Sequence, residues 1–252
     1  MYTIATLTEL RQHLGFAEAD TAEDARLLAA LEAASRTIER STHRHYCPHV
    51  LTIAHDVEPG NAAAILLRAD LLELLTVLDS DGDSISLDAL EVLPGGVLHR
   101  TDGEAFSYLT NPDNAISITA LWGYHPNWSD AWDSSGDTVQ ESPLTADDAT
   151  LTVADSGNFQ VGHLLRIDSE YIRVLSIDSD NQVLTVARGV QGTTAAEHTS
   201  GSAIDLYLPP ADVKHLCLQW ARWLYKEPDS EPGQIPGLLQ DSLDGLRRIS
   251  VR

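Results

Sequence analysis

The pattern of apolar and polar residues predicts helices at the two ends of the chain and strands between them. Within residues 21–44, apolar side chains recur at steps of three and four, which places them on one face of a helix, and charged side chains fill the other face. Glu32 and Arg36 stand four apart in the favourable order, and Pro48 forbids continuation. We therefore predict an amphipathic surface helix about 36 Å long.

Two shorter helices are predicted near the chain ends. Thr6 and Glu9 have the spacing of a capping box, and Gly15 stands where that first helix would end. A later helix begins after Pro210 and carries an apolar stripe that needs a partner face. The stripe comprises Val213, Leu216, Cys217, Trp220 and Leu224. We expect it to pack on the 21–44 helix, so that both chain ends form one helical domain.

Short apolar runs bounded by turn residues predict β-structure in the middle of the chain. Strands are expected at 50–53, 64–67, 74–78 and 116–122, with a hairpin turn at Asp81-Gly82. Residues 125–143 are polar and are interrupted by proline and glycine, which is typical of a linker. Five evenly spaced runs then predict a small β-barrel or sandwich. These runs are 150–153, 164–167, 171–177, 183–186 and 203–206.

The predicted fold class is therefore α+β, with a helical domain, a β-hairpin region and an inserted β module. Residues 1–143 form the first part of the core, 144–207 the inserted module and 208–227 the closing core helix. Proline and glycine then predict a flexible C-terminal arm over 228–252.

The net charge of the chain is −22, from 38 acidic and 16 basic residues, and most of it falls in residues 51–143. No basic stripe marks a nucleic-acid-binding surface, so specific DNA binding is disfavoured. Acidity can equally reflect solubility or a saline habitat. No run approaches the roughly 20 apolar residues of a membrane span, and the first residues lack a signal region, so we expect cytoplasmic synthesis and no membrane partner.

The candidate metal sites are weak. Residues 43–49 contain His43, His45, Cys47 and His49, but the rest of the chain lacks the paired spacing of a zinc site, and a helix end explains the cluster. The acidic run 79–83 fails the calcium-loop pattern, because Ser84 stands where glycine is needed. We expect no metal.

Catalytic motifs are absent, since the chain has no nucleophile elbow, zinc-protease, phosphate-loop or dinucleotide pattern. We expect neither an enzyme nor a cofactor. Glu170 and Arg188 are expected to form a structural ion pair. Cys47 and Cys217 are expected to be buried and unpaired.

The order of these elements resembles the head-to-tail connector, or adaptor, family of tailed bacteriophages. The resemblance is carried by residues 42–46 (THRHY), the turn at Asp81-Gly82, the strand 116–124 (ISITALWGY) and the helix opening at 210–213 with Trp220 and Tyr225. The intervening strings 162–171 (GHLLRIDSEY) and 188–198 (RGVQGTTAAEH) look like a β module that recurs in phage virion and tail proteins.

The resemblance implies a dodecameric homo-oligomeric ring beneath the portal protein, in the neck of the virion, assembled in the host cytoplasm. A stopper or tail-completion protein would follow the ring, and DNA would pass its lumen without specific binding. Adaptor tails often dock on the portal, so the resemblance assigns portal contacts to the arm. The residues concerned are Arg247, Arg248, Ile249, Val251 and Arg252.

Two other functions stay open. The chain could be a phage tail or baseplate component whose β module binds a host glycan or a neighbouring tail protein. Trp128 and Trp132 would then be stacking platforms or interface anchors, although they could equally pack over a domain junction. A salt-adapted enzyme would require a pocket with strongly perturbed titratable groups.

Overall fold

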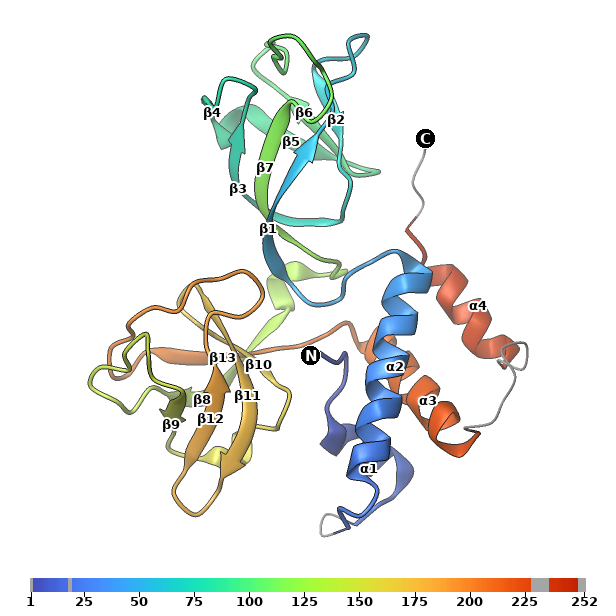
Figure 1. Cartoon of the computed structure of the whole chain (residues 1–252), viewed down its shortest axis with the longest axis vertical. Coiled ribbons are helices and arrows are strands. Elements are labelled where there is room, and N and C mark those ends of the chain that lie inside the picture. The colour runs from blue at the N-terminus through green and yellow to red at the C-terminus, as the bar shows by residue number, and fades with distance from the viewer. Residues whose placement is uncertain (1, 18–19, 228–235, 249–252) are drawn as a thin grey trace. The chain divides into compact units, whose positions relative to one another are not determined.

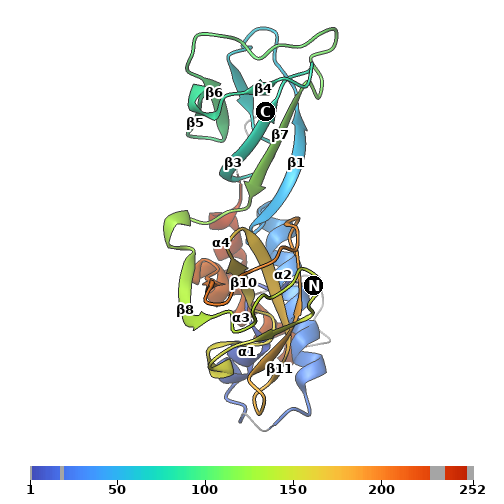
Figure 2. The ribbon, with the colours of Figure 1, turned by 90° about the vertical axis from the view of Figure 1, so that its left-hand side faces the viewer.

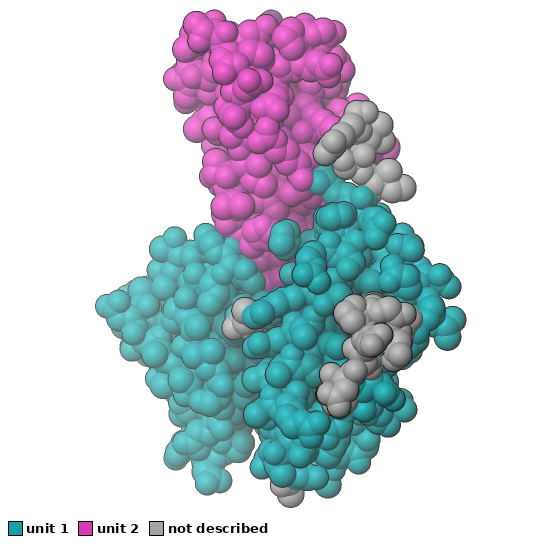
Figure 3. Space-filling view, turned by 45° about the vertical axis from the view of Figure 1, so that its right-hand side comes forward, with its two compact units in different colours: residues 1–46, 125–248 teal, residues 47–124, 249–252 magenta. Residues whose placement is uncertain are grey.

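The computed structural model describes residues 2–17, 20–227 and 236–248, and it shows a mixed α+β chain. The chain divides into two compact units, which Figure 3 colours separately. Unit 1 comprises residues 1–46 and 125–248, and unit 2 comprises residues 47–124. The boundary predicted at 143 therefore moves, because residues 47–124 enclose a hydrophobic core of their own.

The described part of unit 1 contains four α-helices, which gather together in Figure 1. They are α1 (Leu7–Leu14), α2 (Asp24–Thr42), α3 (Ala211–Lys226) and α4 (Gly237–Leu246). The predicted capping box opens α1: the Thr6 hydroxyl accepts a bond from the Glu9 N–H at 3.1 Å, and the Thr6 N–H donates to the Glu9 carboxylate at 2.8 Å. Gly15 ends α1 in the left-handed conformation, as expected.

Helix α2 buries its predicted apolar face against α3. Leu27, Leu31 and Ile38 have no accessible surface, and Trp220 of α3 is almost as deeply buried. The Ser35 hydroxyl donates to the Leu31 carbonyl and lies 3.4 Å from the Cys217 sulfur on α3. Burial raises the pKa of the Cys217 thiol to about 12. The predicted contact between the N-terminal and C-terminal helices is confirmed.

Helix α4 lies inside the segment predicted as a flexible arm, so that prediction is corrected over residues 237–246. Leu239 and Leu243, one turn apart, are buried, and the helix packs on α2 and α3. Pro236 immediately precedes the first turn, a place where proline does not interrupt a helix. Residues 228–235 and 249–252 lie outside the described residues.

Unit 2 contains a four-stranded and a three-stranded antiparallel sheet that share one core. The first sheet has the order β1-β7-β3-β4 (Figure 2), formed by His49–His55, Ile116–Trp122, Leu71–Leu78 and Ser84–Ile85. The second has the order β2-β6-β5, formed by Ala64–Leu66, Val97–Arg100 and Leu90–Leu93. A short 3-10 helix spans Leu87–Ala89. The predicted hairpin turn at Asp81-Gly82 joins β3 to β4.

The β module of unit 1 is a six-stranded antiparallel sheet with the order β8-β13-β10-β11-β12-β9. Its strands are β8 (Trp132–Thr138), β9 (Thr150–Thr152), β10 (Leu164–Ile167), β11 (Glu170–Asp178), β12 (Val183–Ala187) and β13 (Ala203–Tyr207). Two 3-10 helices, Trp128–Asp130 and Ser156–Asn158, precede β8 and follow β9. Within the described residues, β8 and β9 are the two edge strands of this sheet. They are not paired with each other there, so the sheet is not closed into a barrel by strand pairing.

The segment predicted as a linker, 125–143, contains β8, which is an edge strand and carries few apolar residues. Its buried positions are polar and are satisfied by backbone groups distant in sequence: the Ser135 hydroxyl donates to the Ile204 carbonyl at 2.6 Å. The Asp137 carboxylate accepts bonds from the N–H groups of Ala154 and Asp155, just beyond β9. The module therefore begins near residue 131 instead of residue 144. Strand β8 pairs with β13 although its sequence lacks the alternation of apolar and polar residues by which a strand is predicted.

Within the described residues, no helix combines the length and the apolar character that a bilayer span requires. The longest, α2, has 19 residues and is charged along one face.

Candidate functional site

A basic groove lies beside the C-terminal end of α2. It is open and encloses about 820 Å³. Its lining residues are Ala33, Arg36, Thr37, Glu39, Arg40, His43, Arg44 and His45. Cations at this position are favoured by the partial negative charge of the helix C-terminus, where carbonyl groups have no partner in the helix.

Two cations of the groove lie near carboxylates. Arg36 keeps 60% of its side chain exposed and lies 3.9 Å from Glu32, while His45 lies 3.7 Å from Glu39. Arg40 is exposed and forms no ion pair with any residue that the structure describes. Arg40 therefore supplies an open positive charge to the groove.

The C-terminal end of α4 is hydrogen-bonded to the C-terminal end of α2, beside the groove. The guanidinium of Arg247 donates to the Ser41 carbonyl at 3.1 Å, and the Arg44 guanidinium donates to the Leu246 carbonyl at 2.8 Å. The backbone N–H of Arg248 donates to the Thr42 carbonyl at 2.8 Å. Two of these bonds satisfy carbonyls at the end of α2 and the third satisfies the last carbonyl of α4, which fixes the last described residues beside the groove.

Five arginines thus meet at one end of α2, in a chain with 16 basic residues in total. They are Arg36, Arg40, Arg44, Arg247 and Arg248. Two of the five predicted portal-binding residues, Arg247 and Arg248, therefore lie beside the groove, at the end of α2, and are not among its lining residues. The other three, Ile249, Val251 and Arg252, lie outside the described residues. The spacing of Arg36 and Arg40 was visible in the sequence, but the approach of the C-terminal arginines depends on α4.

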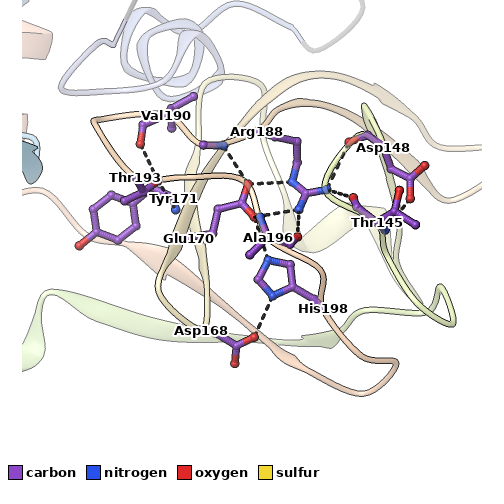
Figure 4. A network of polar contacts seen from close by, with 11 residues as sticks. Thr145, Asp148, Asp168, Glu170, Tyr171, Arg188, Val190, Thr193, Ala196 and His198 are labelled. Carbon is purple, nitrogen blue, oxygen red and sulfur yellow. Dashed lines mark hydrogen bonds and ion pairs between the residues drawn. The ribbon is translucent and has the colours of Figure 1, made fainter.

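A second polar cluster, shown in Figure 4, lies inside the β module and is centred on Glu170. Its carboxylate accepts five hydrogen bonds: two from Arg188, one from His198 and one each from the N–H groups of Gly189 and Ala196. Burial alone would raise the pKa of Glu170, but these bonds outweigh it and lower the pKa from 4.5 to about 2.

Arg188 is as fully engaged as Glu170. Besides the carboxylate, its guanidinium donates to the carbonyls of Thr145 (2.7 Å), Asp148 (3.3 Å) and Ala196 (2.6 Å). The pair therefore ties the 144–148 segment and the 188–198 loop to the start of β11. The expected ion pair between Glu170 and Arg188 is present.

The string 188–198 is a structural loop wrapped around this carboxylate. Gly189 has a positive φ of 56°, and a Cβ there would lie 2.8 Å from the Ala195 nitrogen. The Thr193 hydroxyl donates to the Val190 carbonyl and accepts from the Tyr171 N–H. The loop ends at His198, whose ring nitrogens lie 2.8 Å from Asp168 and 2.9 Å from Glu170. Every polar group of the cluster is directed at another part of the module, which fits a structural role.

Trp132 lies in an aromatic cluster of the β module. The Arg166 guanidinium lies 4.5 Å from its ring centroid, and the Tyr171 and Tyr207 centroids lie 5.2 and 5.3 Å away. Trp128 meets the Trp132 ring edge-on at 6.2 Å. These contacts pack Trp132 within the module, and a glycan-stacking role for Trp128 and Trp132 stays a prediction. A role for Trp128 and Trp132 as interface anchors stays a prediction.

Metal-ligating residues do not gather in the described part of the chain: it contains no group of three or more His, Cys, Asp or Glu side chains poised for an ion. In the acidic run 79–83, the Asp79 carboxylate instead accepts the N–H groups of Asp81 and Asp83, which closes a turn. Cys47 and Cys217 are buried thiols that form no disulfide.

Comparisons with known proteins give little. No family model matches the chain, and no curated protein matches it. Among solved structures, the chain is similar to one in "Neck of empty GTA particle computed with C6 symmetry", with 16% sequence identity and a TM-score of 0.48. The similarity covers 99% of this chain and 92% of that chain.

Proposed function

We propose that this protein is a structural component of a phage-like virion neck, a head-to-tail adaptor that forms a ring beneath the portal and lets DNA pass. The protein has no enzymatic part in this proposal. It would be assembled in the host cytoplasm as a homo-oligomer, twelvefold by family resemblance, with the portal on one side and a stopper or tail-completion protein on the other.

One observation carries the proposal: Arg247 and Arg248, which directly follow α4, are hydrogen-bonded to carbonyls at the end of α2. This places a basic surface next to the last described residues of an acidic chain, which suits attachment to an acidic groove on a larger partner. The order of elements that resembles adaptors supports the same function.

The acidity of the rest of the chain is compatible with a conduit. With a net charge of −22, the surface repels phosphates without sequence preference, so DNA would move through the lumen without being held.

Co-sedimentation with portal-bearing heads tests the proposal. Removing residues 240–252 is a poor test, because it also removes the buried Leu243 from the helical core. Replacing Arg247 and Arg248 by glutamine keeps α4 and removes charge. We expect this variant to bind heads at least about tenfold more weakly, a loss typical of charged contacts at an interface.

The matched control is Arg222→Gln, which removes an exposed arginine from α3. It should bind like the wild type. Equal occupancy of the heads by wild type and by the Arg247/Arg248 variant would rule out docking through this surface.

A further inference from the structure

Unit 2 carries the charge opposite to that of the basic groove beside α2. Residues 47–124 contain twelve acidic residues and only two basic ones, Arg68 and Arg100. Arg68 is already bound by both carboxylate oxygens of Asp56, at 2.9 and 2.8 Å. Unit 2 therefore presents a strongly negative surface.

Five of the twelve acidic residues of unit 2 lie in the 79–83 turn or in the segment 100–107. The Arg100 guanidinium donates to both carboxylate oxygens of Asp102, at 3.1 and 2.6 Å, and the Ser107 hydroxyl donates to the Asp79 carboxylate at 3.2 Å, so the turn that begins at Asp79 lies beside the 100–107 segment. Asp81 and Asp83 belong to the same tight turn as Asp79 and are exposed. We call these five residues, Asp79, Asp81, Asp83, Asp102 and Glu104, the acidic end of unit 2.

We propose that the basic groove beside α2 receives the acidic end of unit 2 from a second copy of this chain. The inference rests on the proposed ring and names the surfaces that would build it. Complementary charges on two exposed surfaces steer association and fix its register, and Arg40, which has no ion-pair partner among the described residues, supplies the open positive charge.

Nucleic acid fits the groove less well than a second copy. Glu39 lines the groove and Glu32 stands one helical turn before Arg36, so a continuous phosphate backbone would meet carboxylates as well as arginines. Carboxylates on a folded surface are discrete, so they can reach the arginines without facing the glutamates.

The placement of the two surfaces predicts the symmetry of the assembly. The groove belongs to unit 1 and the acidic end to unit 2, so the contact joins two different patches and is not self-complementary. A contact of this kind adds copies head to tail and closes into a ring when the rotation allows it. Each copy would use one groove and one acidic end.

Two neutralising variants test this contact by sedimentation velocity in low salt. The groove variant carries Arg36→Gln and Arg40→Gln, and the acidic-end variant carries Asp81→Asn and Asp83→Asn. The wild type should form a closed oligomer, and each variant alone should remain a monomer. A mixture of the two variants should form a one-to-one dimer and grow no further, because it retains one good contact and lacks the second.

Each control removes one charge elsewhere. Arg26→Gln lies on α2 outside the groove, with the same 60% side-chain exposure as Arg36, and Glu73→Gln lies toward the other end of β3 from Asp79. Both should assemble like the wild type. Salt should dissociate the wild-type oligomer, since exposed charges are screened over about 8 Å at physiological ionic strength.

Several outcomes overturn the inference: a monomeric wild type, a groove variant that assembles normally, or mixed variants that do not pair. A groove variant that assembles but loses retention of a DNA duplex would show a phosphate site instead. These measurements contain no heads, so a failure here leaves the head-binding test of the proposed function independent.

Discussion

Arg188 holds Glu170 in a two-point contact, with Nε 2.8 Å from one carboxylate oxygen and Nη2 2.8 Å from the other. The side chains keep only 7% and 1% of their surface exposed. Removing one member of such a pair leaves the other charge buried without compensation. The contact therefore makes the β module depend on both residues together.

Arg188→Met should destabilise the protein by about 3–5 kcal/mol, because it leaves the Glu170 carboxylate buried with three of its five donors. Chemical denaturation monitored by Trp fluorescence measures the loss. The control is Arg166→Met, which breaks a more exposed pair with Asp205 and should cost less. Equal losses in the two variants would contradict the central role of the Glu170 pair.

Stability should fall as the pH is lowered from about 5 toward 2. The pKa of Glu170 is lowered from 4.5 to about 2, so its stabilising effect is complete above 4.5 and is lost as protonation proceeds, by about 3 kcal/mol in total. Unfolding free energies measured across this range should show a smaller slope in Glu170→Gln. An unchanged slope in that variant would assign the acid sensitivity to other carboxylates.

Gly189→Ala should destabilise the module more than Gly201→Ala. Both glycines have positive φ, 56° and 88°, so both substitutions strain the backbone. At Gly189 a Cβ would also lie 2.8 Å from the Ala195 nitrogen, whereas nothing lies within 4 Å at Gly201. We expect a difference of about 1 kcal/mol or more in thermal unfolding. Similar melting temperatures would show that the 188–198 loop relaxes easily.

Residues 47–124 should fold alone as a fragment. Their ends lie side by side, since β1 and β7 pair from His49↔Trp122 to His55↔Ile116, and the core of the unit comes from residues 53–122. Cooperative unfolding and dispersed amide resonances would support this. A fragment that stays unfolded would show that unit 2 needs unit 1.

Local sequence signals predicted much of the fold. The capping box at Thr6, the apolar faces of α2 and α3, and most strands of the module are set by residues near one another in the chain. Strand β8 was missed because its buried side chains, Ser135 and Asp137, are polar and are satisfied by distant backbone groups. Helix α4 is not predicted because the prolines and glycines that precede it indicate a loop, and its buried face consists of only two residues, Leu239 and Leu243.

The candidate sites were less predictable, because both depend on residues far apart in sequence. The string 188–198 stood out, but its purpose requires Glu170, 18 residues before Arg188, at its centre. The basic groove joins the end of α2 to residues about 200 positions later. Such contacts follow from tertiary packing, which the periodicity of one segment does not specify.

The insertion of unit 2 also bears on how the chain reaches its native state. The N-terminal helices and the rest of unit 1 are separated by residues 47–124, so their contacts have high sequence separation and would ordinarily form slowly. Unit 2 is one continuous stretch, and pairing of β1 with β7 brings residues 47 and 124 close together. If it folds first, the loop that unit 1 must close shrinks to a few residues, which lowers the entropic cost of nucleation. Folding of the acidic unit thus favours folding of the helices on either side of it in the sequence.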